Sequence, residues 1–180
     1  MLLAILQSPL SLVIDEMDDL YLKIQLRISA RKHGIPVIMA ADNGDGTVVD
    51  IERFDLDPHR PLMHGDIPET ELLSIPREVP RAQAAKIISA WVGSENIAPR
   101  MMSSLMELGK TLYTWPQLGT AASLSGALLS YVARAILTGL PIGQGKFVIS
   151  PEKLFDPTWD SPASVTKRKA TLSAFKKTMV

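Results

Sequence analysis

The sequence contains no cysteine, and this absence removes several classes of site at once. Disulfides, thiolate zinc sites, redox Cys-x-x-Cys pairs and cysteine nucleophiles are all excluded within these 180 residues. An excess of charge of one sign is lacking too, because 19 Lys and Arg residues balance 19 Asp and Glu residues. Without a global basic field there is no electrostatic reason to expect nucleic acid as a partner.

A glycine-rich phosphate loop is also missing. The closely spaced glycines at Gly44-Asp-Gly46 and Gly143-Gln-Gly145 continue neither as GxGxxG nor as a Walker sequence. Residues 1–8 have no positive n-region and too short an apolar run for a signal peptide. The apolar run of residues 119–130 resembles a membrane span, but Arg134 soon follows it. We therefore expect a cytoplasmic chain with no membrane partner and one globular core, which begins partway through a nucleotide fold.

The stretch from Ser11 to Asp55 predicts a strand, a helix and a second strand. Residues 12–14 form a short apolar run that leads into Asp15, and apolar residues at helical spacing follow over residues 20–31. Gly34 ends the helical pattern, and residues 35–41 are apolar enough for a strand buried on both faces. A crossover helix between two such strands predicts a right-handed βαβ unit with parallel strands.

An acidic cluster, Asp15, Glu16, Asp18 and Asp19, follows the first predicted strand. Ligands of open α/β sheets gather at the carboxyl ends of strands, and a carboxylate there can hold Mg²⁺. Asp18 is the best candidate for a metal ligand. The alternative is that Asp18 or Asp19 caps the helix N-terminus, and local spacing alone favours the cap.

Three segments together resemble a known superfamily: Val13-Ile-Asp-Glu-Met-Asp-Asp-Leu20, Ala30-Arg-Lys-His-Gly-Ile-Pro-Val-Ile-Met39 and Asp50-Ile-Glu-Arg-Phe-Asp55, with Lys23 between the first two. Their order is similar to the ThiF/MoeB/HesA superfamily of ubiquitin-activating-type adenylating enzymes. The nearest resemblance is to bacterial proteins described as having a THIF-type NAD/FAD-binding fold. The likeness covers roughly residues 12–149.

This resemblance implies that Asp18 coordinates the magnesium of ATP and that Met17, Asp19 and Leu22 line the nucleotide. An Asn commonly follows the metal-binding Asp in the superfamily, whereas Asp19 stands here and makes the pocket more acidic. The implied reaction is the attack of a substrate carboxylate, often that of a ubiquitin-like protein, on the α-phosphate of ATP. No residue of this chain acts as a nucleophile in that reaction. The superfamily's glycine-rich loop lies upstream of the acidic strand end, so we expect no adenylation by these 180 residues alone.

Between the second strand and residue 80 the sequence predicts a hairpin and a long loop. Asn-Gly and Asp-Gly within residues 42–47 favour a hairpin turn into an antiparallel strand at 47–51. A calcium loop is excluded, because Arg53 stands where an EF-hand needs its Glu. This arginine is predicted to pair with nearby carboxylates, and contact with a ligand anion is the alternative. Residues 56–80 predict an irregular loop with a helical turn near 68–73. The resemblance makes three residues of this loop candidates for substrate contact, with solvated loop histidines as the alternative: His59, Arg60 and His64.

Apolar residues at helical spacing predict helices over 82–92, 99–112 and 118–140, and the resemblance adds a late strand at 145–149. Met101, Met102 and Met106 are interpreted as core filler. The small-residue helix predicts a homodimer. The basic residues 158–180 predict a tail or linker.

The predicted fold is therefore α/β: a partial, Rossmann-like three-layer sheet with parallel strands followed by antiparallel strands, and several C-terminal helices. A ThiF-like domain would span residues 1–155, with a basic tail or linker at 156–180. Two other functions stay open. One is a non-catalytic α/β binding or scaffold module that has lost its nucleotide loop. The other is an NAD- or FAD-binding oxidoreductase, which is weaker because the dinucleotide fingerprint is missing.

Overall fold

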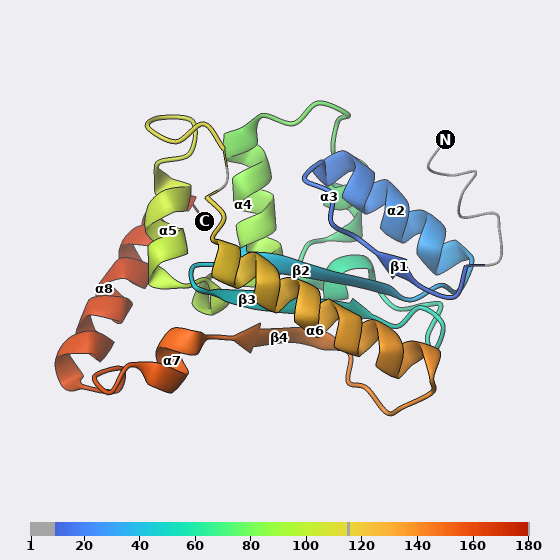
Figure 1. Cartoon of the computed structure of the whole chain (residues 1–180). Helices are drawn as coiled ribbons and strands as arrows, with labels where there is room; N and C mark the ends of the chain where they lie inside the picture. The colour runs from blue at the N-terminus through green and yellow to red at the C-terminus, as the bar shows by residue number, and fades with distance from the viewer. Residues whose placement is uncertain (1–9, 115, 180) are drawn as a thin grey trace. The chain divides into compact units, whose positions relative to one another are not determined.

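The computed structural model describes residues 10–114 and 116–179, and these form an α/β fold with a four-stranded mixed sheet (Figure 1). The strands lie in the order β1 (Val13–Ile14), β2 (Val37–Asn43), β3 (Gly46–Glu52) and β4 (Gly145–Ile149). The prediction that the chain opens without a signal peptide concerns residues that lie outside this description.

The predicted βαβ unit is confirmed. Strands β1 and β2 are parallel neighbours, and the register places Val13 opposite Val37. Helix α2 (Leu20–Lys32) connects them, and its first turn is capped by Asp19, whose carboxylate accepts a hydrogen bond of 2.9 Å from the backbone N–H of Leu22. The helix ends where the sequence indicated, because Gly34 adopts a left-handed φ of 64°.

The predicted hairpin is also confirmed. Residues 44–45 form a two-residue turn between β2 and β3, so these two strands run antiparallel. Gly44 has a φ of 65°, which a residue with a side chain adopts only at a cost. After β3, Arg53 donates two hydrogen bonds to Asp55, of 2.9 and 2.7 Å, which confirms its predicted structural pairing.

The remaining elements are α-helices and two 3₁₀ turns. Their bounds are η1 (Leu62–Gly65), α3 (Glu69–Leu73), α4 (Arg81–Val92), η2 (Ser94–Asn96), α5 (Pro99–Met106), α6 (Gly119–Leu137), α7 (Pro151–Phe155) and α8 (Pro162–Met179). The predicted helices are confirmed with one correction: α5 ends at Met106, well before residue 112. The reason is local, because Gly109 adopts a φ of 79° and turns the chain away from the helix.

The chain divides into two compact units. Of the described residues, 10–40, 49–79 and 126–147 belong to one unit, and 41–48, 80–114, 116–125 and 148–179 belong to the other. The first unit holds β1, α2 and the loop that follows β3.

The second unit has its own buried apolar cluster, which corrects the predicted tail. Residues 158–180 do not form a tail, because most of this segment is helix α8 and its Phe175 is fully buried. Leu172, Phe175 and Met179 lie on one stripe of α8 and pack in this cluster, whereas the prediction had weighed only the basic residues between them. The interpretation of the methionines as core filler is confirmed, since Met102 is buried in the same cluster with Met101 and Met106 packed against it.

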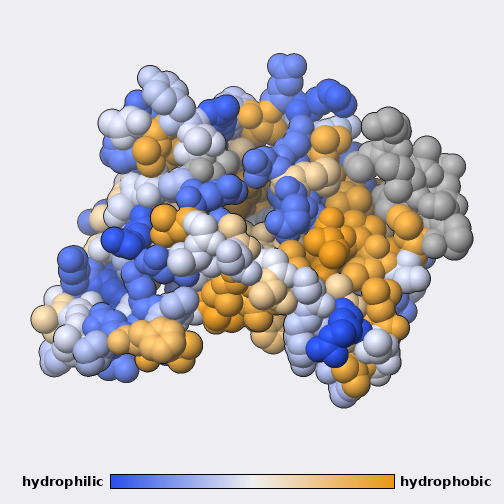
Figure 2. Space-filling model, in the orientation of Figure 1, coloured by the Kyte–Doolittle hydropathy of each residue, from blue (hydrophilic) through white to orange (hydrophobic). Residues whose placement is uncertain are grey.

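Helix α6 is long and apolar enough to cross a membrane, and it is the single helix of the described residues that meets this test. Length and composition alone are weak evidence for a membrane span. One stripe of the helix is buried, including Ala121, Leu129 and Ala135, while Tyr131 and Leu137 are about half exposed, at 50% and 57%. Apolar side chains are visible on the surface around the C-terminal half of this helix (Figure 2).

Candidate functional site

The acidic cluster after β1 separates into residues with different roles. Asp15 is buried, with 1% of its surface exposed, whereas Asp18 and Asp19 are exposed. Glu16 is exposed as well, and its Oε1 accepts a long hydrogen bond of 3.4 Å from the backbone N–H of Ala40. Asp15 therefore belongs to the interior, while Asp18 and Asp19 face solvent at the start of α2.

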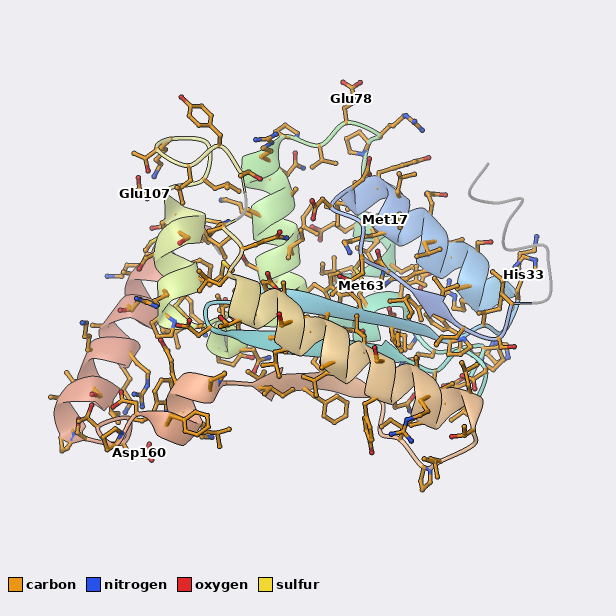
Figure 3. The ribbon with its side chains drawn as sticks, viewed as in Figure 1. Met17, His33, Met63, Glu78, Glu107 and Asp160 are labelled. Carbon is orange, nitrogen blue, oxygen red and sulfur yellow. The ribbon has the colours of Figure 1, made fainter. Side chains whose placement is uncertain are left out.

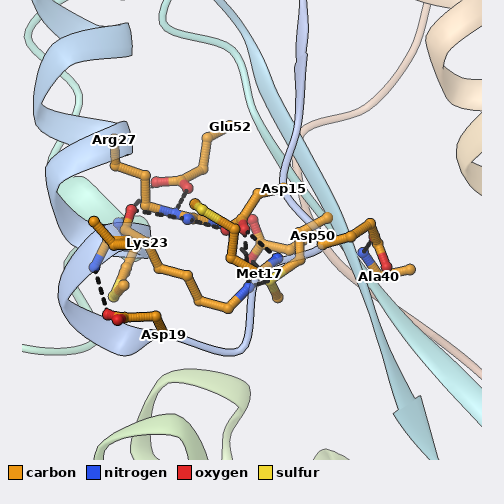
Figure 4. A network of polar contacts seen from close by, with 12 residues as sticks. Asp15, Met17, Asp19, Lys23, Arg27, Ala40, Asp50 and Glu52 are labelled. Carbon is orange, nitrogen blue, oxygen red and sulfur yellow. Dashed lines mark hydrogen bonds and ion pairs between the residues drawn. The ribbon is translucent and has the colours of Figure 1, made fainter. Parts of the chain in front are cut away.

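Asp15 is the centre of a buried polar network (Figure 4). Its Oδ1 accepts hydrogen bonds of 3.0 Å from the backbone N–H of Met17 and from Lys23 Nζ. Its Oδ2 accepts one of 2.6 Å from a terminal guanidinium nitrogen of Arg27. Both oxygens are thus engaged, and the carboxylate joins the end of β1 to the buried face of α2 rather than facing a ligand.

Arg27 continues this network to β3. Its guanidinium is fully buried, and Nε donates a hydrogen bond of 2.6 Å to Glu52 Oε2. The other oxygen of Glu52 accepts a 2.8 Å hydrogen bond from the backbone N–H of Met63. Arg27 also donates to the carbonyl oxygen of Lys23, at 3.2 Å. A buried guanidinium is tolerated when such partners satisfy it, so the network fixes how β1, α2 and β3 pack.

Burial and charge act in opposite directions on the titratable groups of this network. Burial alone would raise the pKa of Asp15, but the charges of Arg27 and Lys23 outweigh it and hold that pKa below its usual value. Burial lowers the pKa of Lys23, against the attraction of Asp15. Burial also raises the pKa of the Glu52 carboxyl, and Arg27 only partly offsets this. The net pKa shifts of the two carboxyl groups are therefore opposite: that of Glu52 is raised, whereas that of Asp15 is lowered.

A second polar chain begins at Asp50, next to Glu52 in sequence. The buried carboxylate of Asp50 accepts a hydrogen bond of 2.9 Å from His64 Nε2. His64 Nδ1 lies 2.5 Å from a terminal nitrogen of Arg60, and because an arginine can only donate, Nδ1 is the acceptor. The imidazole therefore carries its proton on Nε2. Another terminal nitrogen of Arg60 donates to the side-chain oxygen of Gln144.

The backbone that carries His64 is strained. Met63 and His64 have φ values of 50° and 60°, in the left-handed region that residues with side chains seldom adopt, and Gly65 follows at 79°. Each such residue costs on the order of 1 to 3 kcal/mol, and the surrounding contacts must hold it in place. Here those contacts are the bond from the Met63 N–H to Glu52 and the bond from His64 to Asp50. Strain of this kind often marks a functional loop.

The residues predicted to bind nucleotide lie together on the loop after β1 and in the first turn of α2. Asp18 is exposed, and among the described residues no hydrogen bond or ion pair engages its carboxylate. Asp19 is the helix cap, so the alternative interpretation is confirmed for this residue. Met17 is half-buried beside the start of α2 (Figure 3), and Leu22 is half-buried in its first turn.

A magnesium ion at this position would have fewer than three ligands of these kinds from the described chain. No group of three or more His, Asp or Glu side chains in residues 10–114 and 116–179 could hold a metal ion. Asp18 fits as one oxygen ligand of Mg²⁺, which commonly takes only one or two carboxylates and completes its shell with water and phosphate oxygens. The candidates His59 and His64 do not come together as ligands, since His59 is exposed and His64 binds Asp50.

The buried network was not foreseen from the sequence, although it left a signal there. Leu20, Lys23, Ile24 and Arg27 share one helix stripe, so two cations stand at positions where α2 faces the core. Asp50 and Glu52 likewise alternate along β3 with apolar residues. Charged side chains at core-facing positions predict buried ion pairs.

Comparison with known proteins leaves the family open. No family model matches the chain, and no solved structure matches it. An uncharacterized protein of Mycobacterium tuberculosis (strain CDC 1551 / Oshkosh) is 31% identical over 150 residues, which cover 82% of this chain. These residues are 20% of that protein, so the chain spans about a fifth of the length of its relative. What this chain is similar to is therefore one part of a longer protein whose function is not described.

Proposed function

We propose that this chain is the Rossmann-like part of a ThiF-type adenylating enzyme that binds Mg-ATP at the loop after β1. In the proposed reaction a substrate carboxylate attacks the α-phosphate of ATP, and pyrophosphate leaves. The substrate would be the C-terminus of a ubiquitin-like protein or a small carboxylic acid. The observation that carries the proposal is the unengaged carboxylate of Asp18 at the carboxyl end of a parallel strand.

The surroundings of Asp18 support nucleotide binding. The loop from Asp15 to Asp19 joins β1 to the N-terminus of α2, where the helix dipole favours bound anions such as phosphate. The bonds of Asp15 to Met17, Lys23 and Arg27 anchor the beginning of this loop. Because the neighbouring acids are already engaged, with Asp15 in the network and Asp19 in the cap, Asp18 is the one left to bind a metal among the described residues of the loop.

The magnesium ion, when bound, would neutralise phosphate charge and make the α-phosphate easier to attack. Asp18 would hold one coordination position and so orient the phosphates relative to α2. The chain's own closely spaced glycines are engaged elsewhere, since Gly44 belongs to the β2–β3 turn. We therefore propose that another segment supplies the backbone amides that hold the phosphates.

Two further properties belong to this proposal. An ATP-dependent enzyme needs a compartment rich in ATP, so we propose a cytoplasmic location. We also propose a homodimer through α6, whose outer surface exposes Tyr131 and Leu137 beside small residues.

The test is calorimetric titration with Mg-ATP of the purified chain reconstituted with an upstream fragment that carries a glycine-rich loop, with and without Asp18→Asn. We expect the substitution to weaken Mg-ATP binding by about tenfold or more, because a charged ligand contributes roughly 1.5 to 3 kcal/mol. Thermal stability should not change, since Asp18 has no partner in the described chain to lose. The matched control is Asp57→Asn, another exposed aspartate on a loop, which should bind as the parent does.

The alternatives give different results in the same titration. Equal Mg-ATP affinity in the parent and in Asp18→Asn would remove Asp18 from the site. Absence of nucleotide binding altogether would favour the non-catalytic module, and tight binding of NAD or FAD in place of ATP would favour the oxidoreductase.

A further inference from the structure

The loop that follows β3 carries a guanidinium without a carboxylate partner. Among the described residues, Arg60 contacts two neutral acceptors, Gln144 and His64, and its Nε–H is buried with no acceptor at all. Other arginines of the same unit differ. Arg31 forms a fork with both oxygens of Glu69, at 2.9 and 2.5 Å, and Arg53 forms one with Asp55. Arg60 is thus a permanent positive charge whose hydrogen-bonding capacity is incompletely used.

Hydrogen bonds with neighbouring residues fix both the backbone and the side chain of Arg60. Its carbonyl oxygen accepts a hydrogen bond of 3.3 Å from Arg31, which Glu69 holds in turn. Its side chain is aimed by His64, and His64 is fixed by Asp50, whose exposed fraction is 2%. The left-handed backbone at residues 63–64 is what places the imidazole between Asp50 and Arg60.

The partner on the other side of Arg60 is held as well. Gln144 lies two residues before Lys146, and Lys146 Nζ donates a hydrogen bond of 2.7 Å to Asp66. This ion pair ties the segment around Gln144 to the loop that carries Arg60 and His64. A strained loop, an oriented cation and an amide that can offer either its oxygen or its NH₂ group therefore meet at one place.

We propose that Arg60, together with Gln144, binds an oxyanion in the form of a carboxylate or phosphate group. The anion would replace the Gln144 oxygen on Arg60 and accept hydrogen bonds from the planar guanidinium, which matches the two oxygens of such a group. Gln144 would turn its amide and donate from nitrogen. His64 is a positioning residue: Asp50 holds its proton on Nε2, so Nδ1 keeps Arg60 aimed. This site does not depend on nucleotide binding at Asp18.

The experiment is an NMR titration of the whole chain with sodium phosphate and, separately, with sodium acetate, each against sodium chloride at matched ionic strength. The reporters are the Arg60 Nε–H and the His64 imidazole signals. We expect saturable shifts of both signals with at least one of the two anions. Shifts with phosphate alone would assign a phosphate-bearing ligand, and shifts with acetate alone would assign a carboxylate.

Three variants distinguish specific anion binding at Arg60 from a general attraction of anions to positive charge. Arg60→Gln should weaken binding by about tenfold or more, since it removes a charge-assisted partner. Arg60→Lys should bind with intermediate affinity, because it keeps the charge and loses the fork. The control Arg53→Gln removes an arginine that is already paired and should leave binding unchanged. Equal shifts with sodium chloride, no saturation with either anion, or unchanged affinity in Arg60→Gln would each overturn the proposal. The signals of the unsubstituted chain decide the matter even if Arg60→Gln fails to fold.

Discussion

Removing the charge of Arg27 is the sharpest test of the buried network. The substitution Arg27→Met keeps much of the side-chain volume and deletes every guanidinium donor. The structure then leaves Glu52 Oε2 and Asp15 Oδ2 without the donors that now lie 2.6 Å away. Both side chains are fully buried, so water does not replace those donors.

The expected loss follows from this burial. Breaking a buried ion pair by removing one partner costs about 3 to 5 kcal/mol, because the other charge stays buried and uncompensated. Two carboxylates depend on Arg27, so we expect a value in the upper part of that range at neutral pH. The matched control, Arg53→Met, removes a pair that is partly exposed and should cost no more than about 1 kcal/mol.

The loss of stability in Arg27→Met should depend on pH in a definite direction. Burial already raises the folded pKa of Glu52 above its unfolded value near 4.5, and removing Arg27 takes away the largest opposing charge, while Asp15 loses one of the two cations that lower its pKa. The folded variant then binds more protons than the unfolded chain, so its free energy of unfolding increases as the pH falls from neutral toward this value. The difference between the parent and Arg27→Met should therefore be largest at neutral pH and shrink in mild acid.

Urea unfolding of both proteins at several pH values provides the measurement. A further variant, Arg27→Met with Glu52→Gln, should recover part of the loss, since it removes one of the stranded charges. A cost below about 1 kcal/mol at neutral pH, or a cost that does not change with pH, would refute the assignment of Arg27 as the compensating charge.

Three other predictions concern separate elements. Phe175→Ala should destabilise the chain by about 3 to 5 kcal/mol in urea unfolding, whereas Phe155→Ala, at an 82% exposed residue, should change stability by less than about 0.5 kcal/mol; equal effects would return residues 158–180 to the role of a tail. Asp19→Ala should cost about 0.5 to 2 kcal/mol and Asp19→Asn much less, because Asn also caps helices, and a large loss in Asp19→Asn would point to a role beyond capping. Light scattering at micromolar concentration should show a dimer that Leu137→Arg converts to a monomer, and a monomeric parent would contradict the proposed dimer surface.

The βαβ unit could be predicted because its signals are local. The apolar strand runs, the Asp cap and the terminating Gly34 lie within or next to the elements that they define, and the hairpin is set by the turn that begins at Gly44. The assignment of Asp19 as a cap has the same origin. An element can be predicted from the sequence when the residues that determine it lie within it or next to it.

The buried network and the strained loop could not be predicted in the same way. Arg27 and Glu52 are 25 residues apart, and no local rule pairs them. The left-handed backbone at Met63 is stabilised by Glu52, on a strand, rather than by its own sequence. Helix α8 was missed for a related reason: its apolar stripe makes sense only with the buried cluster of the second unit that it completes.

Glu52 connects the two polar clusters of the first unit. One of its oxygens accepts from Arg27, which belongs to the network behind the acidic loop, and the other accepts from the Met63 N–H, which belongs to the strained turn that positions His64. Burial raises the pKa of this carboxyl, and both Arg27 and the Met63 N–H act against that shift by stabilising its ionised form. Removing either donor would take away the hydrogen bond to one oxygen of this buried carboxylate and so weaken the binding of the other donor. The packing of α2 and the aim of Arg60 are therefore set by the same buried carboxylate, which explains how a strained turn is kept in an otherwise irregular loop.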